Sequence, residues 1–105
     1  MSTYDRLSPL ASSAITSLGD VIRRGRRART MTQEELAERA RVSRLTVLKI
    51  ESGNPGVAIW AWVSVMEVLG LLGTLQALHD PVAQAMDAAH GRRVRKRDLR
   101  KKLDF

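Results

Sequence analysis

The segment TQEELAERARVSRLTVLKIESG, residues 32–53, predicts two short helices separated by an abrupt turn. Thr32 and Glu35 have the spacing of a capping box, in which each side chain satisfies a free backbone N–H at the start of a helix. The first helix is expected over residues 33–40. Apolar residues at helical spacing give it one face that can pack on a core: Leu36, Ala37 and Ala40.

The second helix of this segment is expected over residues 43–52 and is polar on one side. Ser43 is a suitable N-cap, and Gly53 ends the helix as the residue that tolerates a left-handed conformation. Val47 and Ile50 point inward. The residues that project outward are Arg44, Leu45, Leu48 and Lys49. Two short helices joined by a turn of about three to four residues are typical of a helix-turn-helix, whose second helix enters the major groove of DNA.

The composition excludes several classes of protein. The 105 residues suffice for one domain with a modest core. The chain has no cysteine, and its two histidines, His79 and His90, lack a metal-binding spacing. No constellation of histidine, cysteine or paired carboxylates indicates catalysis, so we expect neither an enzyme nor a metal or cofactor. The chain opens with polar MSTYDR instead of a signal pattern, and we expect it in the cytoplasm.

Positive charge is concentrated at the C-terminal end. Of the net charge of +7, residues 92–105 (RRVRKRDLRKKLDF) contribute +6, from eight Lys/Arg and two Asp. The other ten basic and nine acidic residues contribute +1. Binding to a polyanion would therefore come from this tail and from local clusters such as Arg23, Arg24, Arg26, Arg27 and Arg29.

Three interpretations of the basic tail stay open. It is a solvated extension, an arm that grips DNA phosphates without regard to sequence, or a segment that folds on a protein partner. In the third case Leu99, Leu103 and Phe105 would be the apolar anchors. A nuclear-localisation signal fits the composition but nothing else supports it.

Residues 57–78 are apolar enough to be compared with a membrane span, since Glu67 is their only charge. Polar and small residues interrupt the run, and Glu67 would lie unfavourably near the middle of the bilayer. We therefore expect two helices, broken near Gly70 and buried on more than one side. In so small a domain, helices that are apolar all round usually imply a partner surface.

The remaining segments complete an all-α chain of five to six helices. We expect a flexible N-terminal arm over residues 1–12, the helix-turn-helix domain over 13–80, an additional helix over 81–91 and the basic tail over 92–105. The first helix is expected to start at Leu10 or Ser13 and to end at Arg29. Asp80 and Pro81 can cap and start the last helix. The helices between are expected over residues 58–69 and 71–79.

The residues expected to touch DNA lie in the helix-turn-helix segment. A reading helix uses long polar side chains, so Arg44 and Lys49 are candidates for base edges or nearby phosphates. Leu45 and Leu48 cannot donate hydrogen bonds, but they could contact thymine methyl groups. Gln33 could meet a phosphate together with free N–H groups at the start of its helix. Each of these could instead be an ordinary surface residue, as could the shorter phosphate or capping groups Thr32, Ser43 and Thr46.

Many positions match, in register, the Xre family of helix-turn-helix repressors. The matching residues are Leu18-Gly19, Ile22-Arg23, Arg26, Thr32-Gln33, Leu36-Ala37, Val42-Ser43, Val47, Ile50-Glu51 and Gly53. Over about residues 15–75 the chain thus resembles this family, which includes the phage repressor and Cro proteins. The resemblance implies a lambda-repressor-like fold and an ion pair between Arg26 and Glu51 that ties the first helix to the end of the reading helix. The alternative for these two residues is a pair of unrelated surface charges.

Two residues depart from the family pattern. Arg41 stands where the turn usually has glycine, and a left-handed residue other than glycine is strained by about 1 kcal/mol or more. We therefore expect a slightly different turn, in which Arg41 could itself reach a phosphate. Gly25 replaces a usual apolar residue, so it either allows a close approach of helices or weakens the first helix by up to about 1 kcal/mol relative to alanine.

The run after Gly53, NPGVAIWAWVSVMEVLGLLGTLQAL, resembles a narrower branch, the HipB-like antitoxins that pair with HipA-type serine/threonine kinases. This resemblance implies a homodimer that binds a palindromic operator in double-stranded DNA, represses its own operon and helps to neutralise the kinase toxin. A stand-alone Xre-family regulator without a kinase partner is the alternative, and an RNA-binding or membrane-associated protein is a third reading. The residues expected to divide between core and dimer interface are Trp60, Trp62, Val65, Val68, Leu71, Leu72 and Leu75.

Overall fold

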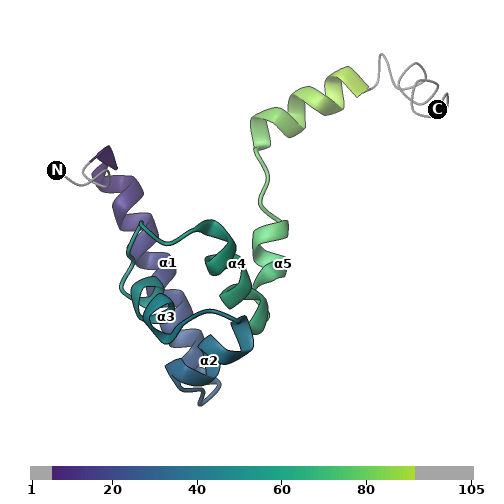
Figure 1. Ribbon diagram of the computed structural model, residues 1–105. Coiled ribbons are helices and arrows are strands. Elements are labelled where there is room, and N and C mark those ends of the chain that lie inside the picture. Colours follow the sequence, from purple (N-terminus) through teal and green to yellow (C-terminus); the bar gives the residue numbers. More distant parts are fainter. Residues whose placement is uncertain (1–5, 92–105) are drawn as a thin grey trace, which may run out of the picture. The chain divides into compact units, whose positions relative to one another are not determined.

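The computed structural model describes residues 6–91, and the regular structure among them is helical (Figure 1). The helices are α1 (Pro9–Ala28), α2 (Gln33–Ala40), α3 (Arg44–Glu51), α4 (Ile59–Val68) and α5 (Leu72–Gln76), and residues 81–91 form a further helix. By their contacts the residues form two units, one ending at Leu75 and the other beginning at Gln76. The predicted all-α fold is confirmed, whereas the basic tail, residues 92–105, lies outside the described residues.

Helix α1 begins at Pro9, earlier than the predicted start at Leu10 or Ser13, because Ser8 caps it. The Ser8 hydroxyl accepts a hydrogen bond from the backbone N–H of Ala11 at 3.1 Å, and proline suits the first helical position. Residues 9–12 are therefore helical, and their assignment to a flexible arm over 1–12 is wrong.

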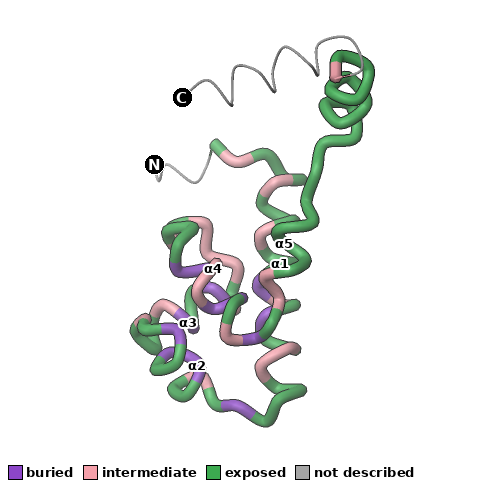
Figure 2. The backbone as a smooth tube through the Cα atoms, turned by 90° about the vertical axis from the view of Figure 1, so that its right-hand side faces the viewer, coloured by how far each residue is buried: buried purple, intermediate pink, exposed green. Residues whose placement is uncertain are grey.

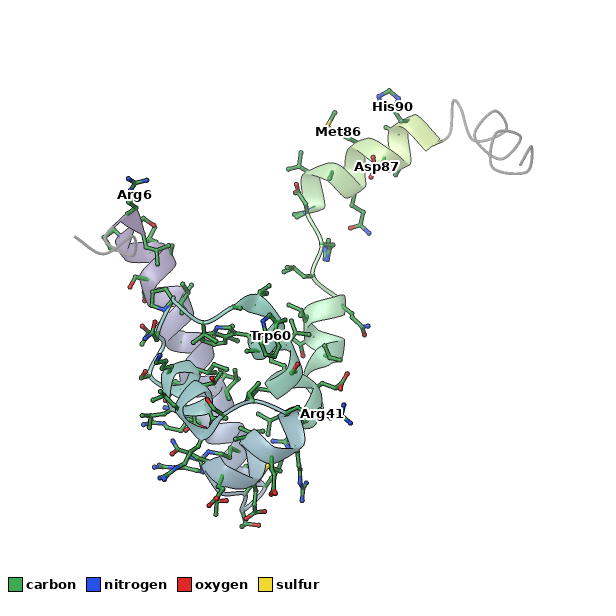
Figure 3. The ribbon with its side chains drawn as sticks, in the orientation of Figure 1. Arg6, Arg41, Trp60, Met86, Asp87 and His90 are labelled. Atoms are coloured by element: carbon green, nitrogen blue, oxygen red, sulfur yellow. The ribbon has the colours of Figure 1, made fainter. Side chains whose placement is uncertain are left out.

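The turn between α2 and α3 keeps a left-handed residue although that residue is an arginine. Arg41 has φ 58° and ψ 41°, and its backbone N–H donates to the carbonyl of Glu38 at 3.2 Å. The next N–H, of Val42, donates to the carbonyl of Ala37 at 3.0 Å. The expectation of a different turn is therefore wrong. These two hydrogen bonds close α2, and the left-handed backbone of Arg41 that they require is strained by about 1 kcal/mol. The Arg41 side chain is exposed (Figure 3).

The core lies among the first four helices. Helix α2 packs on α3 and α4, and α1 packs on α3, so the buried segments face one another (Figure 2). The inward positions predicted for α2 and α3 are confirmed, because Leu36, Val47 and Ile50 have no exposed surface. The largest fully buried side chains are Ile22, Leu36, Val47, Ile50, Val65 and Leu69.

Glycine is required where α1 crosses the end of α3. A Cβ atom on Gly19 would collide with the backbone oxygen of Ile50. Gly53 has φ +74°, and a Cβ there would lie 2.6 Å from the Cα of Thr16. Gly25, which the sequence singled out, is less constrained: its Cβ would meet the movable Arg29 side chain at 3.3 Å and Leu69 at 3.6 Å. The close approach of α1 to its neighbours is therefore made at Gly19.

The residues that were predicted to lie in the core or at a dimer interface differ in how far they are buried. Trp62 and Val65 are 5% and 0% exposed and belong to the core, which is one of the two roles predicted for them. Val68 and Leu71 pack against that core and are half-buried, as is Leu72. Trp60, labelled in Figure 3, is 61% exposed, and Leu75 is 37% exposed. Among residues 6–91, no helix combines the length and the apolar character that a membrane span needs.

Candidate nucleic-acid interface

Side-chain caps set the starts of both helices of the helix-turn-helix. The Thr32 hydroxyl accepts from the backbone N–H of Glu35 at 3.0 Å and donates to the Glu35 carboxylate at 3.2 Å. The Ser43 hydroxyl accepts from the backbone N–H of Thr46 at 3.0 Å, and the Ser43 and Thr46 hydroxyls lie 2.9 Å apart. Of the hydroxyls predicted as phosphate or capping groups, those of Thr32 and Ser43 act as caps and fix the starts of α2 and α3, whereas the Thr46 hydroxyl contacts only the Ser43 hydroxyl.

An ion pair joins α1 to the end of α3. The Arg26 guanidinium donates to both carboxylate oxygens of Glu51, from Nε at 2.6 Å and from Nη2 at 3.0 Å. Its Nη1 donates to the backbone carbonyl of Met31 at 2.8 Å. The two side chains are 11% and 4% exposed, respectively. Arg26 therefore holds α3 against α1 through a two-pronged, largely buried contact.

The same carboxylate also receives the side chain of Gln33, so one network links three helices. Gln33 lies at the start of α2, and its Nε2 donates to Glu51 Oε1 at 3.2 Å. Hydrogen bonding to Glu51, together with its negative charge, raises the pKa of Arg26 from its ordinary value, while burial opposes that rise. Arg26 consequently stays charged at neutral pH, and α3 is held by charge as well as by packing.

The outward face of α3 carries every residue that was predicted to read bases. Arg44 and Lys49 are exposed, and the leucines between them are also open to solvent, with Leu45 58% and Leu48 50% exposed. The inward side of the helix is filled by Val47 and Ile50 in the core. The helix therefore presents a fixed face of mixed cationic and apolar character.

A polar hollow opens beside this face, where the end of α1 meets the starts of α2 and α3. Its volume is about 560 Å³, and its lining residues are Arg26, Arg27, Thr30, Met31, Thr32, Gln33, Glu34 and Arg44. Arg26 is engaged with Glu51, so the cations that would face a bound anion are Arg27 and Arg44. The first backbone N–H groups of a helix also attract anions, whereas the Glu34 carboxylate in the same lining opposes them.

A second hollow, of about 360 Å³, continues the cationic surface along α1. It is lined by Arg23, Arg26, Arg27, Gln33, Leu48, Glu51 and Ser52. Asp20 pairs with both Arg23 and Arg24, at 2.7 and 2.9 Å, and so reduces the positive charge of those two. Arg27 lines both hollows and is the α1 residue best placed to contact an anion beside α3.

Of the residues predicted to touch DNA, Thr32, Gln33, Arg44 and Leu48 line the two hollows, whereas Ser43, Leu45, Thr46 and Lys49 do not. Gln33 and Arg44 share the first hollow, and Leu48 lines the second, whereas Arg41 lines neither. Thr30 and the Gln33–Glu51 hydrogen bond were not predicted. Arg27 belongs to the basic cluster that is visible in the sequence. No local sequence pattern shows that Thr30, in the loop after α1, lines the same hollow or that the Gln33 amide bonds to Glu51.

In the described part of the chain, no group of three His, Cys, Asp or Glu residues is arranged to hold a metal ion.

Compared with known domain families, residues 17–78 match a helix-turn-helix domain. Comparisons with curated proteins and with solved structures give no match.

Proposed function

Because the chain belongs to the helix-turn-helix domain family, we propose that this DNA-binding regulator inserts α3 into the major groove of an operator and so represses transcription. The observation that carries the proposal is the outward face of α3, where exposed Arg44 and Lys49 stand on a helix held rigidly from behind. A reading helix needs both features, because base contacts discriminate only when the side chains are held in register.

Phosphate contacts are proposed beside that helix. Arg27 and Arg44 border the hollow at the start of α2, and free N–H groups there add a favourable dipole. Contacts of this kind fix the orientation of a protein on the duplex without reading sequence. They also release counterions, so we expect DNA affinity to fall steeply as the salt concentration rises.

A homodimer on a palindromic operator is the proposed assembly. Ile59 and Trp60, at the start of α4, are 73% and 61% exposed. Beside them is an apolar hollow of about 230 Å³, lined by Ile15, Leu18, Pro55, Val57, Ile59 and Trp62. Large apolar groups gathered on one surface favour contact with a second protein surface. A two-fold dimer would set two copies of α3 about 34 Å apart, one turn of DNA.

The narrower proposal is that the chain is the antitoxin of a HipA-type toxin–antitoxin module. Its support is the resemblance of the run after Gly53 to HipB-like proteins. Without a kinase partner, the same surfaces serve a stand-alone regulator. Co-purification with the product of a neighbouring kinase gene distinguishes the two, because only the antitoxin should form a stable complex with that kinase.

Selection from a randomised DNA library with the full chain tests the operator proposal. We expect enrichment of an inverted repeat and footprints on paired half-sites. Arg44→Ala should abolish that selection while leaving helicity unchanged. Arg24→Ala is the matched control, since Arg24 is exposed, pairs with Asp20 and lines neither hollow. Selection of the same site by the Arg44→Ala variant would contradict the assignment of α3 as the reading helix.

A further inference from the structure

The exposed residues of α3 and its C-cap lie side by side on one arc of the helix surface. At about 100° per residue, their order across that arc is Arg44, Leu48, Ser52, Leu45 and Lys49. The two leucines therefore flank the centre of the arc, and the two cations form its edges. Val47 and Ile50 occupy the opposite, buried side.

This order determines what each side chain meets when the helix enters a groove. The centre of the arc faces the base edges on the groove floor, and its edges face the two phosphate walls. Arg44 and Lys49 stand at these edges, where their long side chains can reach an outer base edge as well as a phosphate. The centre offers leucine side chains that are 58% and 50% exposed, and a hollow of about 340 Å³ lined by Arg44, Leu45 and Leu48.

Leucine neither donates nor accepts a hydrogen bond, so it recognises a base only through an apolar group. The C5 methyl group of thymine is the apolar group that base pairs present in the major groove. An isolated exposed leucine on a protein surface needs no explanation. Here two leucines stand together at the centre of the face that is proposed to meet DNA.

We propose that Leu45 and Leu48 read thymine methyl groups, so that each operator half-site is defined by a pair of thymines; this inference rests on the proposed function. Side chains three residues apart on a helix have Cβ atoms about 5–6 Å apart. Successive base pairs are separated by about 3.4 Å along the helix axis. The leucine pair therefore spans one to two base-pair steps, and the two thymines lie that far apart, on either strand.

Replacement of single thymines by uracil tests the inference, because uracil lacks only the methyl group. The operator is first selected by the full chain from a randomised library, and each thymine of a half-site is then replaced in turn. We expect two positions, one or two steps apart, at which replacement lowers affinity about three- to fivefold, as the loss of one buried methyl group should. Replacements at the other thymines should change affinity less than twofold.

Two variants connect those positions to their readers. Leu45→Ala and Leu48→Ala should each bind the thymine operator more weakly and become insensitive to uracil at one of the two positions. Leu10→Ala is the matched control, because Leu10 is 85% exposed in the first turn of α1. It should keep the full uracil sensitivity. Unchanged far-UV circular dichroism shows that the variants fold.

The possible failures are separable. If an operator is selected but uracil changes affinity less than twofold at every position, thymine reading is overturned and the proposed function stands. If the leucine variants weaken binding to thymine and uracil DNA equally, the leucines act elsewhere, for example on a protein partner, and the inference is again overturned. If no operator is selected, the inference and the proposed function both fail.

Discussion

Replacement of Arg26 by methionine should destabilise the fold far more than the same replacement at an exposed arginine of the same helix. The variant removes three hydrogen bonds, two to the Glu51 carboxylate and one to the Met31 carbonyl. The Glu51 side chain, 4% exposed, is then left with the Gln33 amide at 3.2 Å. An amide donates a hydrogen bond but does not neutralise a charge.

Breaking a buried ion pair by removing one partner typically costs about 3–5 kcal/mol, because the remaining charge stays desolvated. The lower end applies here, since Gln33 still donates to Glu51 and Arg26 itself is 11% exposed. We therefore expect a loss of about 3 kcal/mol, a large part of the about 5–15 kcal/mol that stabilises a typical domain. For a domain of this size, Tm should fall by at least about 12 °C.

Urea and thermal unfolding of the full chain, followed by circular dichroism, measure this loss. Arg23→Met is the matched control, because its pair with Asp20 has side chains 45% and 35% exposed and is expected to contribute at most about 1 kcal/mol. The double variant Arg26→Met with Glu51→Met should recover part of the loss, since it leaves no lone buried charge. If Arg26→Met costs no more than Arg23→Met, the pair is a surface pair in energetic terms and the reasoning is refuted.

Four further variants, one of them a control, test the geometry of the helices by thermal unfolding. Gly19→Ala should lower the free energy of unfolding by about 2 kcal/mol, because its Cβ would collide with the Ile50 oxygen. In the control Gly73→Ala the Cβ meets no atom within 4 Å, so that variant should gain about 0.5 kcal/mol. Equal effects would contradict the close approach of α1. Arg41→Gly should raise stability by about 0.5–1 kcal/mol, since glycine is unstrained in the left-handed turn, and a loss would show that the arginine side chain stabilises the fold. Ser43→Ala should cost about 1 kcal/mol through the lost cap of α3, and no change would mean that the observed hydrogen bond adds no net stability.

The helix-turn-helix could be located from sequence because its signals are local. Thr32 and Ser43 are capping residues one position before a helix, and both helices start where these caps predict. The apolar spacing behind each cap gave the buried face correctly, including Leu36 and Ile50. Local hydrogen bonding and helical periodicity fix these features, and neither depends on the rest of the chain.

Features set by tertiary contact were not predictable in the same way. Trp60 and Trp62 are both apolar and two residues apart, yet only the packing of α4 shows that one is 61% exposed and the other buried. Gly25 stood out as an interruption inside a helix, but the steric need for glycine is at Gly19, where the helix crosses the Ile50 backbone. The role of Gln33 depends on a carboxylate 18 residues away.

The buried ion pair links the stability of the fold to the charge of the surface that is proposed to face DNA. Glu51 is the last residue of α3, and it also lines the cationic hollow beside Leu48. Left alone, its negative charge would repel the phosphates that this hollow is proposed to meet. Arg26 neutralises this charge and donates two hydrogen bonds to it. If the Gln33 amide turned toward a phosphate, Glu51 would lose one hydrogen bond but would keep its cationic partner. Because the pair is largely buried, salt screens it less than the exposed Arg23–Asp20 pair, so α3 stays anchored under the ionic conditions that should weaken its proposed contacts with DNA.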